Sequence, residues 1–251
     1  MLFAQLTFKE IEKLPKDTLF SISISPLEAH GPHLPVSTDF EISKKIEGEA
    51  IKILRAKGIE CYSLPSLPIG VCKYLESFAG TISIPWKALY KVTLGILKSL
   101  AKHGFQYLII STFHMDLWHL KAIHKAMRKA KKYGMVACEP LSYLYFSKEI
   151  YMDGEIHADI KETSLALYLF PEMVKDYRIK DYKMKMGLID YFKKFKSIAK
   201  NGYIGSPSKA NIEFGEKLFG RCVNFFVESA INLKKGITIE LPLEIKALLR
   251  I

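Results

Sequence analysis

The hydrophobic pattern divides the chain into short apolar runs and longer segments whose apolar residues recur at helical spacing. The apolar runs predict buried strands at residues 18–25, 61–67, 107–113 and 135–138. The periodic segments predict amphipathic helices at residues 40–57, 85–103, 117–132, 161–169 and 210–233. Strands and helices therefore alternate through most of the chain, which favours a mainly parallel sheet with helices on both faces.

These elements predict a single α/β domain with three α/β/α layers that spans residues 1–251. The sequence has no internal repeat, low-complexity tract or linker that would divide this domain. Residues 140–157 carry many aromatic side chains and show little helix or strand periodicity. We interpret them as a lid or a pocket wall. The lysine- and aromatic-rich segment 176–200 is interpreted as an insertion or an oligomer contact.

Composition narrows the class of protein. Of the 251 residues 49% are hydrophobic, but no run of ~18 apolar residues suggests a membrane span. The N-terminal residues lack the basic and long apolar regions of a secretory signal, so we expect a cytoplasmic protein. The cysteines have no CxxC spacing and are expected to be reduced thiols: Cys61, Cys72, Cys138 and Cys222.

The net charge of +11 raises the question of nucleic-acid binding. Nearly all of the excess is lysine spread over predicted helices, whereas nucleic-acid sites concentrate arginine or pair basic residues with exposed aromatics. We therefore expect neither nucleic acid nor a membrane as a partner. A solvated lysine-rich surface explains the charge, and so does steering of an anionic substrate such as a phosphorylated one.

Five side chains with metal-binding chemistry follow two of the predicted strands. Glu28, His30 and Asp39 come after the first strand, and His114 and Asp116 come after the third. Open α/β sheets place ligands at the carboxyl ends of their strands, so we expect these side chains to converge there. Imidazole and carboxylate are ligands of Zn²⁺, Mn²⁺ and Fe²⁺, and a carboxylate such as that of Asp39 can bridge two ions. The pattern predicts a hydrolase with two metal ions.

Each of these residues also has an ordinary structural explanation when it is taken alone. A single histidine after a strand is usually packed or solvated. Asp39 lies in the segment 38–41, which has the sequence of a capping box at a helix start. His103, His119 and His124 lie in predicted helices and are interpreted as structural residues rather than ligands. Convergence at two strand ends is what favours the metal site.

Four segments of the chain carry a resemblance to a known family. They are EAHGPHLPVSTD at residues 28–39, GVCKYLESFAGT at 70–81, HADIKETS at 157–164 and GSPSKANIEFG at 205–215. In sequence and in order, they resemble motifs of the creatininase (creatinine amidohydrolase) superfamily, and the resemblance covers most of the chain. It implies a creatininase-like fold, two divalent ions of zinc, manganese or iron, and a homo-oligomer, often a hexamer.

The resemblance also implies roles for individual residues. The residues expected to bind metal are Glu28, His30, Asp39, His114 and Asp116. Asp116 is one methylene shorter than the glutamate of the creatininases, so Glu162 is expected to hold water or to complete the second ion's coordination. His157 is expected to protonate the departing nitrogen, because an imidazole titrates near neutral pH. The residues expected to contact substrate are Cys72, Ser77, Phe78 and Met115.

The sequence therefore predicts a metal-dependent amidohydrolase that hydrolyses a C–N bond of a small cyclic amide or formamide. One alternative is a formamidopyrimidine-nucleotide deformylase of flavin or deazaflavin biosynthesis, which would suit the positive charge. Others are peptide-bond cleavage and a non-catalytic metal- or ligand-binding protein on the same fold. Residues 112–117 differ from the glycine-rich segment of many relatives, and residues 140–157 lack the tryptophan that stacks on creatinine. We therefore expect poor turnover of creatinine itself.

Overall fold

A four-stranded parallel sheet lies at the centre of the protein, whose computed structural model describes residues 2–147, 149–184 and 199–250. The strands are β1 (Leu19–Ser23), β2 (Cys61–Ser63), β3 (Tyr107–Ser111) and β4 (Val136–Cys138), in the order β2-β1-β3-β4. All neighbouring pairs are parallel, and the last residues of β1 and β3 are aligned with each other. The chain winds outward in both directions from the β1/β3 pair, which is where open sheets bind ligands.

Strand β1 is buried on both faces because helices cover each side of the sheet. Phe20 and Ile22 pack in one hydrophobic cluster and Leu19 packs in another, as expected when successive side chains alternate between faces. On the Leu19 face, the hydroxyls of Ser21 and Ser23 each donate to the buried carboxylate of Glu47 at 2.6 Å. This face therefore combines apolar packing with a buried polar cluster.

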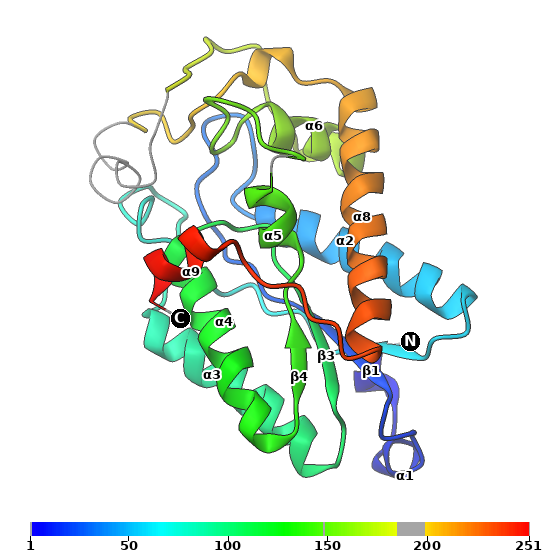
Figure 1. Ribbon diagram of the computed structural model, residues 1–251. Helices are drawn as coiled ribbons and strands as arrows, with labels where there is room; N and C mark the ends of the chain where they lie inside the picture. Colours follow the sequence, from blue (N-terminus) through cyan, green and yellow to red (C-terminus); the bar gives the residue numbers. More distant parts are fainter. Residues whose placement is uncertain (1, 148, 185–198, 251) are drawn as a thin grey trace.

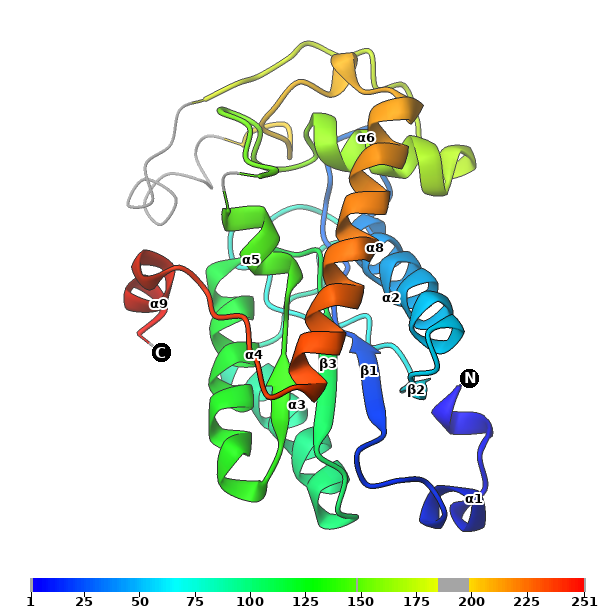
Figure 2. The same cartoon turned by 45° about the vertical axis from the view of Figure 1, so that its right-hand side comes forward.

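Two layers of helices enclose the sheet (Figure 1 and Figure 2). On one side, α2 (Thr38–Ala56) and α8 (Ile212–Lys234) pack against the Leu19 face, and α6 (Ile160–Leu169) packs against both of these helices. On the other side, α3 (Trp86–Lys102) and α4 (Leu117–Ala130) pack together against the Phe20 face. This architecture confirms the predicted α/β fold with a parallel sheet covered by helices on both sides.

Several elements differ from the sequence-based prediction. The strands are shorter than the apolar runs that predict them, because the chain stays buried after regular pairing has ended. The segment 140–157, predicted to be rich in loops, begins with the helix α5 (Leu141–Phe146). Elements that the prediction lacks are too short to show a clear period: α1 (Phe8–Glu12), α9 (Leu243–Leu249) and 3₁₀ turns at Phe3–Gln5, Lys131–Tyr133, Pro171–Met173 and Pro207–Lys209.

The lysine-rich segment 176–200 lies in large part outside the described residues, so its interpretation as an insertion or an oligomer contact stays a prediction. Its described portion includes Tyr182, which forms an antiparallel bridge with Gly205. Among the helices that the structure describes, none combines the length and the apolar character needed to cross a membrane.

Candidate metal centre

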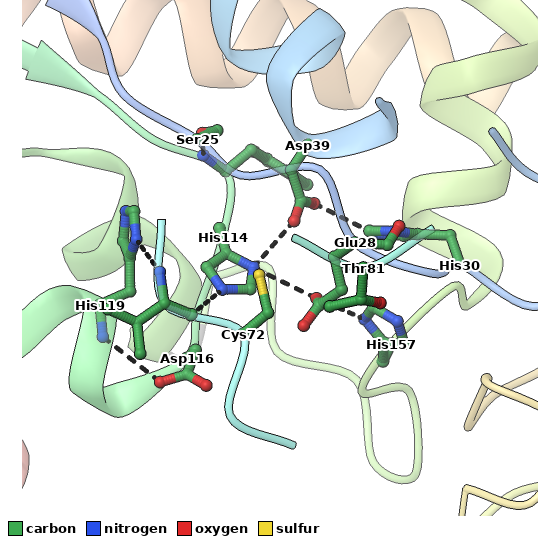
Figure 3. Close-up of polar contacts among 12 residues, drawn as sticks. Ser25, Glu28, His30, Asp39, Cys72, Thr81, His114, Asp116, His119 and His157 are labelled. Carbon is green, nitrogen blue, oxygen red and sulfur yellow. Dashed lines mark hydrogen bonds and ion pairs between the residues drawn. The ribbon is translucent and has the colours of Figure 1, made fainter. Parts of the chain in front are cut away.

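The carboxyl ends of β1 and β3 bring four of the predicted ligands together (Figure 3). Glu28 and His30 lie in the loop after β1, His114 lies in the loop after β3, and Asp39 lies in the first turn of α2. Each of the four residues is at most 4% exposed. Burial of so many ionisable groups is unfavourable unless they pair with one another or bind a cation.

The beginning of α2 leaves the Asp39 side chain directed toward the site rather than toward the helix end. The N-cap residue is Ser37, and no side-chain hydrogen bond caps the helix. Thr38 is already inside the helix and donates its hydroxyl to the carbonyl oxygen of Pro35 at 2.6 Å. The capping box considered for residues 38–41 is therefore wrong, although Asp39 does lie in the first turn of α2.

The Asp39 carboxylate lies between two imidazole rings. Its Oδ1 is 3.1 Å from Nε2 of His30, and its Oδ2 is 2.8 Å from Nδ1 of His114. The opposite ring nitrogens donate to main-chain carbonyls, that of His30 to Glu28 and that of His114 to Val71, both at 2.8 Å. Because these donors fix the tautomer, each neutral ring directs a lone pair at one oxygen of Asp39.

A lone pair that faces a carboxylate oxygen requires a proton or a metal cation between the two. Two further carboxylates complete the arrangement: Oε2 of Glu28 is 3.4 Å from Nδ1 of His114, and Oε2 of Glu162 is 3.7 Å from Nε2 of His30. Donor atoms lie within 4.8 Å of one another in three buried groups: His30–Asp39–Glu162, Glu28–Cys72–His114 and Glu28–His30–His157. These donors could hold divalent cations beside the two imidazoles.

The electrostatics of the cluster also favour a cation. Burial lowers the pKa of His30, but the carboxylates of Asp39 and Glu162 outweigh burial and raise it to about 10. The pKa of His114 is raised in the same way, against burial, chiefly by Glu28. Burial raises the pKa of Glu28 to about 7 and that of Glu162 to about 8. The protein thus retains protons where a divalent cation can replace them.

His157 and Glu162, the residues predicted to be catalytic, lie at the same site. Nε2 of His157 donates to the carbonyl oxygen of Ala29 at 2.9 Å. Its Nδ1 is 4.0 Å from Oε2 of both Glu28 and Glu162. Its ring packs on that of His30, with 4.3 Å between centroids. Burial, and then the positive charge of His30, lower the pKa of His157 to about 3, so the ring is neutral at physiological pH.

The main chain between His157 and α6 brings these two side chains to one side. Ala158 has a φ of 46°, a left-handed conformation that is unfavourable for a residue with a Cβ atom. Its N–H donates to Oε2 of Glu162 at 2.5 Å, and Asp159 accepts from the N–H groups that begin α6. The main chain of His157 also pairs with that of Ile204. Convergence of His157 and Glu162 therefore depends on a tight turn rather than on helical spacing.

Asp116 takes a different position from the other four predicted ligands. As the N-cap of α4, its Oδ1 accepts from the N–H groups of Trp118 at 2.7 Å and His119 at 3.3 Å. Its Oδ2 accepts from the N–H of Lys73 at 2.9 Å. Among the described residues, Asp116 belongs to none of the three donor groups, although it lines the adjacent cavity. Both of its oxygens already accept main-chain hydrogen bonds, and its role as a ligand stays a prediction.

A small cavity lies beside the cluster. Its volume is about 20 Å³, enough for a water molecule. Its less polar walls are Tyr74, Leu75, Phe113, Met115, Tyr145 and Ile156. Of the predicted substrate contacts, Met115 lines the cavity, whereas Ser77 is exposed, Phe78 is half-buried and neither lines it. Because an amide is larger than water, its entry requires these walls to move, and the roles of Ser77 and Phe78 stay predictions.

Cys72 is the residue whose position differs most from what the sequence led us to expect. We predicted a substrate contact, but Cys72 is not among the residues that line the cavity. Its thiol belongs instead to the donor group of Glu28 and His114. The signal in the sequence is the residue type, because a soft ligand inside a motif of a metal site is itself a candidate donor.

His119 supports the site from behind without joining it. Its Nε2 is 3.1 Å from the hydroxyl of Thr112, and its Nδ1 accepts from the N–H of Val71 at 3.3 Å. Its ring stands edge-on to that of His114, with 5.0 Å between centroids. His124, further along α4, pairs with the carboxylate of Glu139 at 3.2 Å. The interpretation of both as structural histidines agrees with these contacts, and His119 also helps to orient His114.

Comparisons with known proteins give two kinds of relative. The family model of creatininase, described as creatinine amidohydrolase, matches residues 4–230. The creatinine amidohydrolase of Pseudomonas putida is 26% identical over 200 residues, which cover 71% of this chain and 75% of that protein. The mycofactocin precursor peptide peptidase of Mycobacterium ulcerans is 24% identical over 212 residues, which cover 81% of this chain and 80% of that protein.

Solved structures share the fold. A mutant creatininase is similar with a TM-score of 0.74 at 22% identity, over 92% of this chain and 97% of that one. A manganese form of creatininase gives 0.71 at 21% identity, over 92% and 97%. A mutant creatininase complexed with creatine gives 0.72 at 20% identity, over 93% and 98%. These likenesses agree with the predicted creatininase-like architecture.

Proposed function

The chain belongs to the creatininase family, and we propose that it is a metal-dependent hydrolase that cleaves a C–N bond of a small amide. The observation that carries the proposal is that a ring nitrogen of each of two buried histidines, His30 and His114, faces one oxygen of Asp39. Glu28 and Glu162 extend this arrangement on either side. A protein that only needed a stable core would gain little from burying this many charges together.

The donor groups support a site for two divalent ions. Glu28, Asp39 and His114 would hold one ion, and His30, Asp39 and Glu162 would hold the other. When bound, the ions activate a water molecule and polarise the carbonyl that it attacks. Zinc, manganese and iron all accept these ligands, and a related structure is a manganese form of creatininase.

His157 is the proposed carrier of the proton that the reaction moves. Its neutral Nδ1 faces Glu28 and Glu162 at 4.0 Å, so it can accept a proton at the centre of the site. The low pKa of His157 makes the protonated ring a strong acid, which suits donation to the departing nitrogen. The hydrogen bond to Ala29 holds the ring in the tautomer that this role needs.

The substrate class is set by the walls of the cavity rather than by the metal centre. Phe113 and Met115 make the wall beside His114 apolar, which supports a small amide or formamide and poor turnover of creatinine. The net charge of +11 supports an anionic substrate, such as a formamidopyrimidine nucleotide. Because one relative is a peptidase for a precursor peptide, peptide bonds belong to the proposed range as well.

The proposal is tested with protein that has been stripped of metal and reloaded with Zn²⁺, Mn²⁺ or Fe²⁺. It is offered creatinine, a formamidopyrimidine nucleotide, simple lactams and short peptides, with product release measured for each. We expect metal-dependent turnover of at least one amide and little turnover of creatinine. Asp39→Asn should abolish it, whereas Asp17→Asn, at a surface aspartate that is 62% exposed, should not.

Two outcomes would contradict the proposal. Two bound ions with no turnover of any amide would favour the non-catalytic binding protein on the same fold. A protein that binds no metal when Zn²⁺, Mn²⁺ or Fe²⁺ is added back would contradict both the hydrolase and the metal-binding protein. The homo-oligomer implied by the sequence resemblance stays a prediction, which the elution volume of the same preparation measures.

A further inference from the structure

The thiol of Cys72 lies at the metal centre. The residue is fully buried, and Figure 3 shows its sulfur beside the ring of His114. Its Sγ, a carboxylate oxygen of Glu28 and a ring nitrogen of His114 lie within 4.8 Å of one another. Zinc bonds of about 2.0–2.3 Å span donors up to about 4.4 Å apart, so small shifts bring all three onto one ion.

We propose that Cys72 is a ligand of the ion beside His114. This position then has sulfur, nitrogen and oxygen donors, whereas the position beside His30 has nitrogen and oxygen donors only. The thiol releases its proton to water as the thiolate binds the cation. The inference rests on the proposed function, because it concerns one of the two ions assigned there. A thiolate favours zinc over manganese, so the two positions differ in the metal that they prefer.

Hydrogen bonds on both sides fix the main chain around Cys72. The carbonyl oxygen of the preceding residue accepts from Nε2 of His114 at 2.8 Å. The N–H of Cys72 donates to the hydroxyl of Ser83 at 3.0 Å, and the next N–H, of Lys73, donates to Asp116 at 2.9 Å. The sulfur is therefore held by a preorganised segment, as metal ligands generally are.

The approach of this loop to the site also depends on Gly70. A Cβ atom at position 70 would lie 2.7 Å from Nδ1 of His119 and 2.9 Å from the side chain of Pro26. A glycine allows the main chain to pass against His119, whose Nδ1 then accepts from the N–H of Val71. Position 72 follows directly and faces His114.

Other roles for Cys72 fit the structure less well. Burial raises the pKa of the thiol to about 12 although His114 lowers it, which is the opposite of an activated nucleophile. The residues that line the cavity do not include Cys72, so a direct substrate contact has no geometric support. Coordination uses the sulfur where it lies, because a bound cation deprotonates a thiol outright.

Cobalt substitution tests the inference directly. Co²⁺ bound to a thiolate gives a sulfur-to-cobalt charge-transfer band in the near ultraviolet, and the wild-type protein should show it. Cys72→Ser should lose this band while keeping the weaker visible bands and two equivalents of cobalt. Cys138→Ser is the matched control, because Cys138 is a buried thiol of β4 that belongs to none of the three donor groups, so the band should be unchanged.

X-ray absorption of the wild-type zinc protein provides a second measurement that needs no variant to fold. We expect a sulfur scatterer at about 2.3 Å together with nitrogen and oxygen at about 2.0–2.2 Å. In competition, Cys72→Ser should lower the preference for zinc over manganese at one position by more than ~10-fold. Two bound ions with only nitrogen and oxygen scatterers would overturn this inference and leave the hydrolase proposal intact. A protein that binds no metal would overturn both.

Discussion

The two halves of the candidate metal centre are built from different kinds of segment. The half beside His114 takes its residues from loops next to the sheet, which are joined by hydrogen bonds between the main chain of one loop and side chains of another. The half beside His30 needs Glu162, which a turn with Ala158 at a φ of 46° brings in from far along the chain. One half is therefore an extension of the sheet, whereas the other depends on how a distant segment is placed.

This difference predicts unequal affinities. Burial raises the pKa of both Glu28 and Glu162, so protons compete with the cation in each half. The half beside His114 also includes the thiol of Cys72. We expect the ion beside His114 to bind more tightly and the ion beside His30 to exchange more readily. Four experiments test whether the two halves differ in this way.

The largest effect is expected from Asp39→Ala, because Asp39 contacts both imidazoles. Both ions should be lost and hydrolysis should fall by more than ~10³-fold, since the ions provide the nucleophile. Metal content by mass spectrometry and activity on the best substrate measure this result. Asp17→Ala, at an exposed aspartate, is the control. If Asp39→Ala retained two equivalents of metal, Asp39 would not bridge the two ions.

A matched pair, Glu28→Gln and Glu162→Gln, separates the two halves. Each change keeps the size of the side chain but removes one anionic donor. Glu162→Gln should weaken only the ion beside His30, and Glu28→Gln only the ion beside His114, each by more than ~10-fold. Calorimetric titration with Zn²⁺ resolves the two steps. If both variants lost the same ion, the division into two halves would be incorrect.

The pH dependence of stability should differ between the metal-free and the metal-loaded protein. In the metal-free protein, folding raises the pKa of Glu28 to about 7 and of Glu162 to about 8, from 4.5. It raises that of His30 from 6.5 to about 10. His157, whose pKa folding lowers, is neutral in both states above about pH 6.5. Above that pH the folded state therefore holds more protons than the unfolded chain, and stability falls as pH rises to about 10.

Bound cations replace these protons, so the rise in melting temperature on adding Zn²⁺ should be larger at pH 8.5 than at pH 6. Scanning calorimetry at both values, with Asp39→Ala as the reference, measures the difference. A metal-induced shift that shrinks as pH rises would contradict the protonation states assigned to the cluster.

The smallest effect on metal binding is expected at Asp116. Asp116→Ala removes the N-cap of α4 and should lower the free energy of unfolding by about 0.5–2 kcal/mol. Asp116→Asn keeps a capping side chain and should cost less. Both variants should retain two ions, because each carboxylate oxygen of Asp116 already accepts a main-chain hydrogen bond. Loss of one ion in Asp116→Ala but not in a helix-cap variant elsewhere, such as Asn211→Ala, would restore Asp116 as the ligand predicted from the sequence.

The sequence alone predicts the four strands, the five long helices and their order. Strand and helix periods are local properties, so the alternation of apolar runs and amphipathic helices already indicates a parallel sheet covered on both faces. The same locality places Glu28 and His30 after one strand and His114 after another. Parallel strands bring these residues to one edge, and the sequence therefore predicted their convergence correctly.

The role of each side chain at that edge depends on tertiary packing. Asp39 and Asp116 are both aspartates near a helix start, yet Asp39 faces two imidazoles and Asp116 caps its helix. Cys72 joins the donors because its loop hydrogen-bonds to groups that follow β3. A carboxylate or thiol takes its partners from whichever groups packing leaves within about 3–4 Å, and those groups lie far away along the chain. Spacing in the sequence does not encode that proximity.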